Sequence, residues 1–277
     1  ITWSLVGSEM CIRDSRQNLQ LRGILLNDLP EILRRLNEAG LSSIQSGFDN
    51  PRNVTGNPLA GIDPNEIIDT RPYATLLQNF LTNNCEGNPE YSNLPRKWNT
   101  AVAGSKQNFL LHNDIVFHPV VNNGILGFSV WIGGILSPLM NAYALPLNAW
   151  VLPDEMCKIM DIIIRLWRNN GEREKRTKGR FRMYLDQVGH EEFRKQVVEL
   201  FGPLEPDPGS KFDDSPRSYF GIHPQKQHGL YFAGMHVPVG RLTAQDLQDI
   251  ATASLSTGVG KLDLQRIKIL SSRALQV

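Results

Sequence analysis

The sequence predicts an α+β protein in which two strand–helix–strand units flank a larger mixed α/β region. The first unit occupies residues 16–48 and the second residues 219–277, and each combines strand patterns with a capped helix. Residues 49–205 mix short apolar runs with one long amphipathic helix pattern. Residues 206–218 are rich in Pro, Asp and Ser, which favours a linker before the second unit.

The first unit is delimited by helix start and stop signals. Residues 16–26 have the pattern of a strand, and Asp28 follows as a helix N-cap. Gly40 is placed to end that helix, because glycine readily adopts the left-handed conformation of a helix terminus. Residues 41–46 then have the pattern of a returning strand.

The second unit repeats this order. Residues 229–239 predict a strand, and Thr243 with Asp246 forms a capping pair before an apolar helix stripe. Residues 261–270 predict the closing strand. Two such units also arise by chance in α/β proteins, so the repeat alone does not establish a common origin.

The middle region contains the clearest helix and an uncharged stretch. The helix pattern starts near Asp154, stops by Gly171 and carries a core-facing stripe of Met156, Ile159, Met160, Ile163 and Trp167. Residues 115–153 contain no Asp, Glu, Lys or Arg, but Pro and Asn interrupt them too often for a membrane span. We expect buried strands there, with a kink or close approach at Gly133–Gly134, and no integral membrane segment.

Bulk composition excludes several classes of protein. The 29 basic and 28 acidic residues nearly cancel, which argues against a nucleic-acid binder. Cys11, Cys85 and Cys157 stand far apart, so neither a disulfide framework nor a zinc site is indicated, and a reducing compartment fits. Residues 1–15 have no signal-peptide pattern and no link to the sequence after them, and we expect them to be an extraneous leader.

The segment "RKWN" is the first candidate for binding chemistry. If residues 96–99 form a strand, Arg96 and Trp98 share one face and Lys97 and Asn99 share the other. A point cation beside an amide suits a small oxyanion. A solvated sheet edge is the alternative explanation.

Two further segments present arginines on a well-defined backbone. In "RQNLQLR", a strand would place Arg16 and Arg22 on one polar face, which is either an oxyanion surface or a solvated outer face. The Pro-, Gly- and Asn-rich loop 49–63 presents Arg52, and such a loop is either a binding loop or a structural turn. If Arg16, Arg52 and Lys97 converge, they form an anion pocket.

A basic run lies over residues 165–182. It holds eight basic residues against Glu172 and Glu174. Such a run is usually a solvated face, and it can also steer an acidic protein partner toward the surface.

Taken together, these segments resemble the ferredoxin-dependent assimilatory nitrite reductases of the sirohaem nitrite/sulfite reductase family. The resemblance rests on "RQNLQLRG", "RNVTGNPLAGID", "DTRPYATLLQNFLTNN", "LPRKWN", "NDIVFHPV", "GFSVWIGG" and "GIHPQKQHGLYFAGMHVPVGRLTAQDL", in family order over about residues 16–262. The residues in these motifs resemble those of a cyanobacterial member of the family. The resemblance implies two ferredoxin-like half-domains flanking a sirohaem-side α/β domain.

The resemblance also assigns roles to residues. It implies that Arg16, Arg52, Lys97 and Asn99 face the anion on sirohaem. It further implies sirohaem-binding positions at Arg22, Asn53, Asn57, Arg96 and Asn113. Sulfite reductases usually carry a second lysine where this chain has Asn99, so the amide favours nitrite over sulfite.

The implied cofactors are sirohaem and a [4Fe–4S] cluster, and the implied partners are nitrite and reduced ferredoxin. The cluster is held in the family by four cysteines in a Cys-x5-Cys and Cys-x3-Cys pattern, and this chain has no such set and no metal ligands of its own. From about residue 265 the tail also departs from the family. We therefore expect an internal fragment, inactive alone, of an enzyme that is a monomer at full length.

The expected reaction of the complete enzyme is the six-electron reduction of nitrite to ammonium, in the cytoplasm or in the plastid stroma of a eukaryote. Three alternatives stay open: a ferredoxin–sulfite reductase, a non-catalytic module that binds an anion or tetrapyrrole, and a truncated product.

Overall fold

A computed structural model describes residues 10–11, 20–21, 23–105, 110–138, 140–210, 212, 219–237 and 241–256. The chain divides into two compact units. The terminal unit comprises Ile1–Ser43, Ser218–Pro224 and Tyr231–Val277, and the central unit comprises Ile44–Arg217 and Gln225–Leu230. The described parts of both flanking segments thus belong mainly to one unit, while the domain boundaries expected from the sequence stay a prediction.

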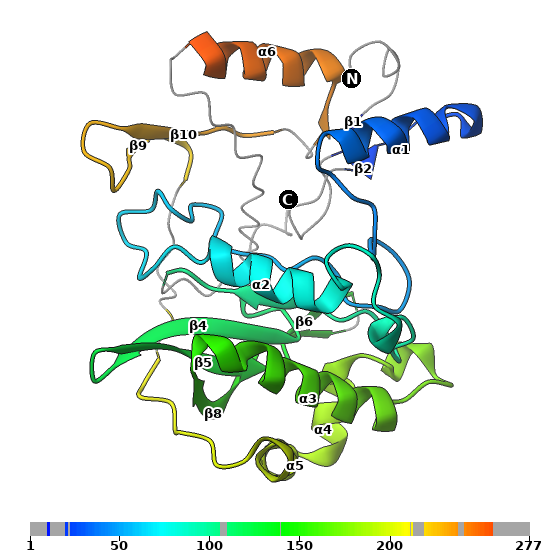
Figure 1. The fold of residues 1–277 in the computed structure, drawn as a ribbon, viewed down its shortest axis with the longest axis vertical. Helices are drawn as coiled ribbons and strands as arrows, with labels where there is room; N and C mark the ends of the chain where they lie inside the picture. Colours follow the sequence, from blue (N-terminus) through cyan, green and yellow to red (C-terminus); the bar gives the residue numbers. More distant parts are fainter. Residues whose placement is uncertain are drawn as a thin grey trace. The chain divides into compact units, whose positions relative to one another are not determined.

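The central unit is built on a four-stranded sheet (Figure 1). Its strands follow the order β3 (Thr100–Val102), β4 (Ile115–Asn122), β5 (Ile125–Ile132) and β8 (Leu145–Val151). β3 and β4 are parallel, and the other neighbours are antiparallel. A separate hairpin joins β6 (Ile135–Ser137) to β7 (Met140–Ala142).

One face of this sheet packs against helix α3 (Met156–Asn170), which lies along the sheet in Figure 1. The predicted stripe is confirmed, because Met156, Ile159, Met160, Ile163 and Trp167 are all buried. The helix also packs against α2 (Arg71–Thr82), α4 (Phe181–Val188) and α5 (His190–Phe201). Because side chains alternate along a strand, Ile115 and Phe117 of β4 join this core while Val116 joins a smaller cluster.

The uncharged stretch folds into strands, as predicted. Gly133 and Gly134 separate β5 from β6, and Gly133 has a positive φ of 81°. A Cβ on Gly134 would lie 2.1 Å from the Leu111 carbonyl oxygen and 2.3 Å from that of Asn113, so only glycine allows this approach. Across the part of the chain described here, no helix combines the length and the apolar character needed to cross a membrane.

The segment 96–99 is not a regular strand, so the alternation expected there does not apply. Only Trp98 makes a bridge, parallel to Pro51, and Thr55 makes a second bridge to Ala101. The loop 49–63 therefore runs beside the β3 edge and takes the pairing positions that a further strand would occupy.

Residues 206–210, part of the expected linker, are attached to the sheet. Asp207 accepts hydrogen bonds from Ser129 Oγ at 2.8 Å and from the Ser210 backbone N–H at 2.9 Å. Burial raises the pKa of Asp207, but hydrogen bonds from the Ser210 side chain and backbone, from Ser129 and from the Gly209 N–H outweigh it and keep that pKa below its ordinary value. A Pro- and Asp-rich segment also specifies an ordered turn, and here that turn packs on the sheet.

In the terminal unit, the order of strands is β11 (Arg241–Leu242), β1 (Met10–Cys11) and β2 (Gln20–Leu21), all antiparallel. β1 lies within residues 1–15, so these two residues are paired with the fold; the origin of that segment stays a prediction. A second sheet pairs β9 (Gly221–Pro224) with β10 (Tyr231–Gly234).

Both predicted terminal helices are present. The 3-10 turn η1 (Leu26–Asp28) leads into α1 (Leu29–Glu38), and Gly40 follows with a φ of 73°. α6 (Ala244–Ser256) begins with the predicted Thr243–Asp246 pair, whose side chains and backbone N–H groups bond reciprocally. The strand expected over residues 41–46 is wrong, because the backbone there forms no strand, and residues 261–270 lie outside the described residues.

Candidate functional site

The loop 49–63 and the segment around Trp98 are joined by backbone hydrogen bonds. Arg52 N–H donates to the Trp98 carbonyl at 2.8 Å, and Trp98 N–H donates to the Asn50 carbonyl at 3.1 Å. Thr55 N–H continues the pairing to the Thr100 carbonyl at 3.1 Å. Arg52 and Lys97, which are distant in sequence, are therefore carried on two adjoining segments of backbone.

Trp98 anchors this edge in the core. Its side chain is fully buried, with ring centroids 5.6 Å from Trp167 and 5.1 Å from Phe181. Its indole Nε1–H donates to Thr100 Oγ1 at 2.9 Å, so the one polar atom of the ring is satisfied. The residues on either side of Trp98, Lys97 and Asn99, are thus fixed by a well-packed neighbour.

Asn99 is buried beside a buried ion pair. Its backbone N–H donates to Asp114 Oδ2 at 2.8 Å, and Asp114 also accepts from Arg180 Nη2 at 3.1 and 3.2 Å. Asp114 is fully buried and Arg180 is 7% exposed. The Asn99 side-chain oxygen is buried without a hydrogen-bond partner among the described residues.

Lys97 is half-buried among other cations. Burial lowers the pKa of its ammonium group, and the positive charges of Arg180, Arg52 and Arg96 lower it further. The carboxylate of Asp114 acts in the opposite direction. A bound anion would stabilise the protonated form of Lys97, because its negative charge compensates both the burial of the ammonium group and the repulsion from the neighbouring arginines.

The site carries more positive than negative charge. Arg96 pairs with Asp49 at 3.0 Å, and Arg176 pairs with the same carboxylate at 2.5 Å. These arginines hold the pKa of Asp49 below its ordinary value despite the opposing effect of burial. The cations of this edge are Arg52, Arg96, Lys97, Arg176 and Arg180, and the carboxylates that face them are Asp49 and Asp114.

The predicted amide positions fall on the same two segments or close to them. Asn53 follows Arg52 in the loop, and Asn57 is buried with its Nδ2 unpartnered among the described residues. Asn57 Oδ1 accepts from the Leu59 N–H at 3.1 Å, which holds the loop turn. Asn113 is buried next to Asp114, and its Nδ2 donates to the Leu110 carbonyl at 2.6 Å.

Not every predicted residue can be placed. Arg16 and Arg22 lie outside the described residues, so their convergence with Arg52 and Lys97 stays a prediction. The sequence reasoning missed Asp114 and counted Arg180 only as part of a basic surface run. No local signal in the sequence distinguishes Arg180 from the exposed cations around it, because its burial depends on Asp114, which is distant in the chain.

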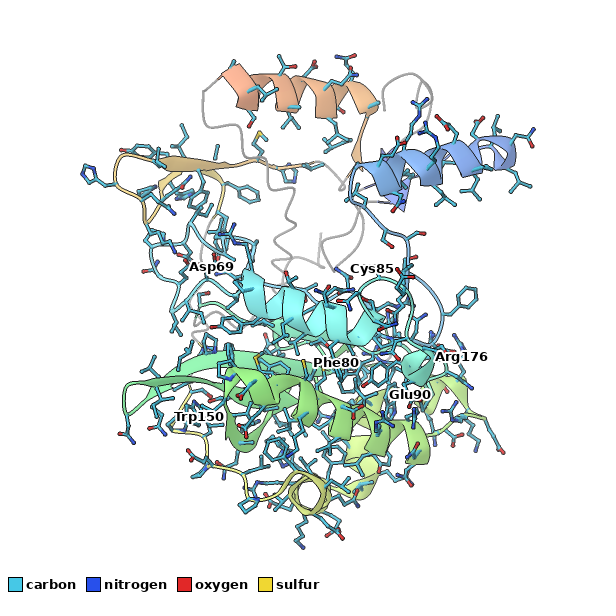
Figure 2. The ribbon with its side chains drawn as sticks, in the orientation of Figure 1. Asp69, Phe80, Cys85, Glu90, Trp150 and Arg176 are labelled. Atoms are coloured by element: carbon cyan, nitrogen blue, oxygen red, sulfur yellow. The ribbon has the colours of Figure 1, made fainter. Side chains whose placement is uncertain are left out.

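The rest of the basic run is partly neutralised by local partners. Glu90, labelled in Figure 2, accepts from Arg165 and Arg168. Arg182 pairs with Asp186, and Arg173 donates to the Asn93 side chain and backbone. The surface charge available to an acidic partner is therefore smaller than the sequence count indicates.

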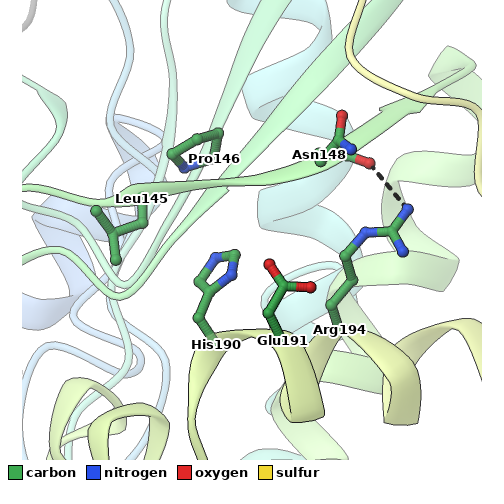
Figure 3. A pocket seen from close by; sticks show the side chains of 6 residues that line it. All are labelled: Leu145, Pro146, Asn148, His190, Glu191 and Arg194. Carbon is green, nitrogen blue, oxygen red and sulfur yellow. Dashed lines mark hydrogen bonds between the residues drawn. The ribbon is translucent and has the colours of Figure 1, made fainter.

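A pocket of about 470 Å³ in the central unit (Figure 3) is lined by none of the cations of the sheet edge. It is lined by Leu145, Pro146, Asn148, His190, Glu191 and Arg194. Arg194 uses two nitrogens to bind the Leu147 and Asn148 carbonyls, at 3.1 and 3.3 Å. With Glu191 beside Arg194, the pocket has no surplus of positive charge and is a weaker candidate for an anion.

The two cysteines whose side chains the structure describes do not form a metal site. Cys85 is exposed and Cys157 is half-buried, and both are free thiols; burial raises the pKa of Cys157. Within the described ranges, no group of three or more His, Cys, Asp or Glu side chains is arranged to hold a metal ion.

Fold and site together define an α+β protein whose sheet edge carries a surplus of positive charge beside a buried amide. The family described as "Nitrite and sulphite reductase 4Fe-4S domain" matches residues 47–203, and the chain belongs to this family. The chain is 46% identical over 254 residues to ferredoxin–nitrite reductase of Synechococcus elongatus, covering 90% of this chain and 50% of that protein. The chloroplastic ferredoxin–nitrite reductase of Zea mays is also 46% identical, over 258 residues, 90% of this chain and 45% of that protein.

The fold agrees with a solved structure. The NirA protein of Mycobacterium tuberculosis superposes with a TM-score of 0.81 at 28% identity, covering 91% of this chain and 45% of that one. The predicted α+β class and its family are thereby confirmed. The chain spans about half the length of the curated relatives that it matches.

Proposed function

We propose that this chain is the substrate-side part of a ferredoxin-dependent assimilatory nitrite reductase. The complete enzyme takes nitrite to ammonium with six electrons and a supply of protons. The observation that carries the proposal is the half-buried Lys97, which has Arg52, Arg96 and Arg180 near it and the buried amide of Asn99 beside it in the chain. The names of relatives that are 46% identical to this chain over the aligned residues support the choice of substrate.

Electrostatics explains why such a cluster selects a small anion. Two unit charges about 4 Å apart interact by roughly 4 kcal/mol at an effective dielectric constant of 20, against about 1 kcal/mol in water. Lys97 and Arg52 together therefore dominate nitrite binding if both lie at contact distance, and Arg16 would add to them. A protonated Lys97 is also a proton source next to the substrate.

Asn99 favours nitrite over sulfite. Its amide can donate to an anion oxygen and, through the unpartnered Oδ1, accept from a nitrogen that has gained hydrogen. Sulfite carries more negative charge and benefits more from a second cation at this position. A ferredoxin–sulfite reductase is the second candidate, since the family includes both activities.

The residues present are suited to sirohaem, an iron tetrapyrrole with several carboxylate side chains. Arg96 and Arg176 share one protein carboxylate, Asp49, so this edge offers arginine donors that suit those carboxylates, and the unpartnered Asn57 Nδ2 provides a buried donor. We assign cofactor contacts to Arg22, Asn53, Asn57, Arg96 and Asn113. Bound sirohaem would supply the iron that takes the anion and passes electrons to it.

The [4Fe–4S] cluster, in contrast, does not match the cysteines of this chain. Such a cluster needs four thiolates, whereas the whole sequence has three cysteines at unrelated spacings. We assign the cluster ligands to parts of the enzyme other than these 277 residues.

Reduced ferredoxin is the electron donor, and the exposed Lys175 and Lys178 are the candidate docking cations of the basic run. The complete protein is a monomer and acts in the cytoplasm, or in the plastid stroma of a eukaryote.

The test is an absorbance titration of the chain with sirohaem, followed by titration with nitrite and with sulfite. We expect nitrite to bind more tightly than sulfite, and Asn99→Lys to shift the preference toward sulfite. Sirohaem binding without any response to either anion would favour the non-catalytic tetrapyrrole module. An unchanged preference in Asn99→Lys would contradict the role given to the amide.

A further inference from the structure

The Asp114–Arg180 ion pair contacts Asn99, one residue of the proposed anion site. Asp114 is fully buried, and its Oδ2 accepts the Asn99 backbone N–H at 2.8 Å. One nitrogen of Arg180 contacts both carboxylate oxygens, at 3.1 and 3.2 Å. The Asn99 carbonyl in turn accepts the Ile115 N–H at 3.2 Å, so Asn99 is held on both sides of its peptide.

Arg180 and its neighbour Phe181 hold two consecutive residues of the site. Phe181 packs on the Trp98 ring with centroids 5.1 Å apart, while Arg180 reaches Asp114 and, through it, Asn99. Two adjacent residues at the start of α4 therefore fix both Trp98 and Asn99. Lys97 directly precedes Trp98 in the chain. The positive charge of Arg180 lowers the pKa of the Lys97 ammonium group, and the negative charge of Asp114 raises it.

A buried ion pair is a poor source of net stability, because the cost of removing two charges from water offsets their attraction. Asp114 and Arg180 instead hold the Asn99 backbone in place and change the electrostatic environment of Lys97.

We propose that Asp114 and Arg180 are positioning residues for the nitrite site, with Asp114 fixing the Asn99 backbone and Arg180 holding Asp114 while adding positive charge near Lys97. This inference rests on the proposed function. It gives Arg180, otherwise one arginine of a surface run, a role in substrate binding.

The experiment is an NMR titration of the chain with its lysines labelled as 13C-dimethyl groups and its backbone with 15N. The Lys97 signal reports its own protonation, and the Asn99 amide reports hydrogen exchange. The variants are Asp114→Asn, Arg180→Gln and Arg180→Lys. Arg168→Gln, whose arginine pairs with Glu90 away from the site, is the matched control.

The proposal predicts opposite changes in Lys97. Asp114→Asn removes a negative charge and lowers the Lys97 pKa further, while Arg180→Gln removes a positive charge and raises it. Arg180→Lys keeps the charge and leaves the Lys97 titration near that of the wild type. It also speeds Asn99 amide exchange roughly tenfold, because an ammonium group holds the carboxylate less rigidly than a guanidinium.

A merely structural role gives a different result. If the variants only loosened packing and admitted water, the Lys97 pKa would rise in both Asp114→Asn and Arg180→Gln, and that outcome would overturn the proposal. Equal Asn99 exchange in wild type and Arg180→Lys would overturn it too, even if Asp114→Asn did not fold.

Nitrite added to the same samples separates the positioning role from the proposed function. If nitrite moves the wild-type Lys97 and Asn99 signals and moves them less in Arg180→Gln, both are supported. If the opposite pKa changes occur but nitrite moves neither signal in the wild type and also fails to bind the sirohaem-loaded chain, the proposed function fails while the positioning of Asn99 by the ion pair stands.

Discussion

Gly134→Ala is expected to be the most damaging single-methyl change in the central unit. The added Cβ would lie 2.1 Å from the Leu111 carbonyl oxygen, 2.3 Å from the Asn113 oxygen and 2.9 Å from the Asn113 nitrogen. Non-bonded heavy atoms need roughly 3.5 Å, so about 1.4 Å of backbone movement is required. The obstacles are backbone atoms, which no rotamer change can move. We therefore expect the upper end of the overpacking range, about 3 kcal/mol lost from the free energy of unfolding.

Urea denaturation followed by tryptophan fluorescence measures this loss. Gly47→Ala is the matched control, because no described atom lies within 4 Å of its added Cβ and its backbone is not left-handed. That control should be neutral or up to about 1 kcal/mol more stable, since alanine restricts the unfolded chain. Gly134→Ala within about 0.5 kcal/mol of the wild type would refute the account of the close approach.

Three further predictions concern the buried Trp98 side chain, the protonation of Lys97 and the cysteine content of the chain. Trp98→Ala should cost about 3–5 kcal/mol in urea denaturation, because a fully buried ring is removed from Trp167 and Phe181; a loss below about 1 kcal/mol would contradict its role as an anchor. Nitrite binding should weaken as pH rises through the lowered pKa of Lys97, since only the protonated form attracts the anion; binding that persists until exposed lysines lose their protons, near pH ~10.4, would count against this. The purified chain should produce no ammonium from nitrite with reduced methyl viologen, because its three cysteines cannot hold the cluster; ammonium formation would overturn the fragment prediction.

Local sequence signals correctly predicted those elements that depend on helix periodicity, on a capping pair or on adjacent glycines. The apolar stripe of α3, the Thr243–Asp246 cap and the glycine pair after β5 each depend on residues adjacent or one turn apart. Helix periodicity and capping need no knowledge of distant partners. Glycine at a close approach is less certain from sequence, yet here two consecutive glycines in an apolar run were sufficient to indicate it.

Elements that depend on partners distant in sequence were not predicted. Residues 41–46 have a strand-like composition, but no neighbouring strand among the described residues pairs with them. Residues 96–99 carry one bridge only, because the loop 49–63 occupies the edge where a full strand would have paired. Strand formation requires a partner, and the local pattern contains no information about one.

The site shows the same division. Arg52, Lys97 and Asn99 were selected from the sequence, and the structure places all three at one sheet edge. Arg180 was counted with exposed cations because a charge run is usually solvated. Its burial depends on Asp114, which is 66 residues away in the chain. A paired buried charge of this kind is visible only in three dimensions.

The most direct test of the central claim is nitrite affinity in the sirohaem-loaded chain with and without Lys97. Lys97→Met keeps the length of the side chain and removes its charge, and Lys195→Met does the same at an exposed helix position. We predict that Lys97→Met weakens nitrite binding between about tenfold and several hundredfold, corresponding to roughly 1.4–4 kcal/mol, while Lys195→Met leaves it unchanged. Equal affinity in Lys97→Met and wild type, or no nitrite binding by the loaded wild-type chain, would contradict the claim.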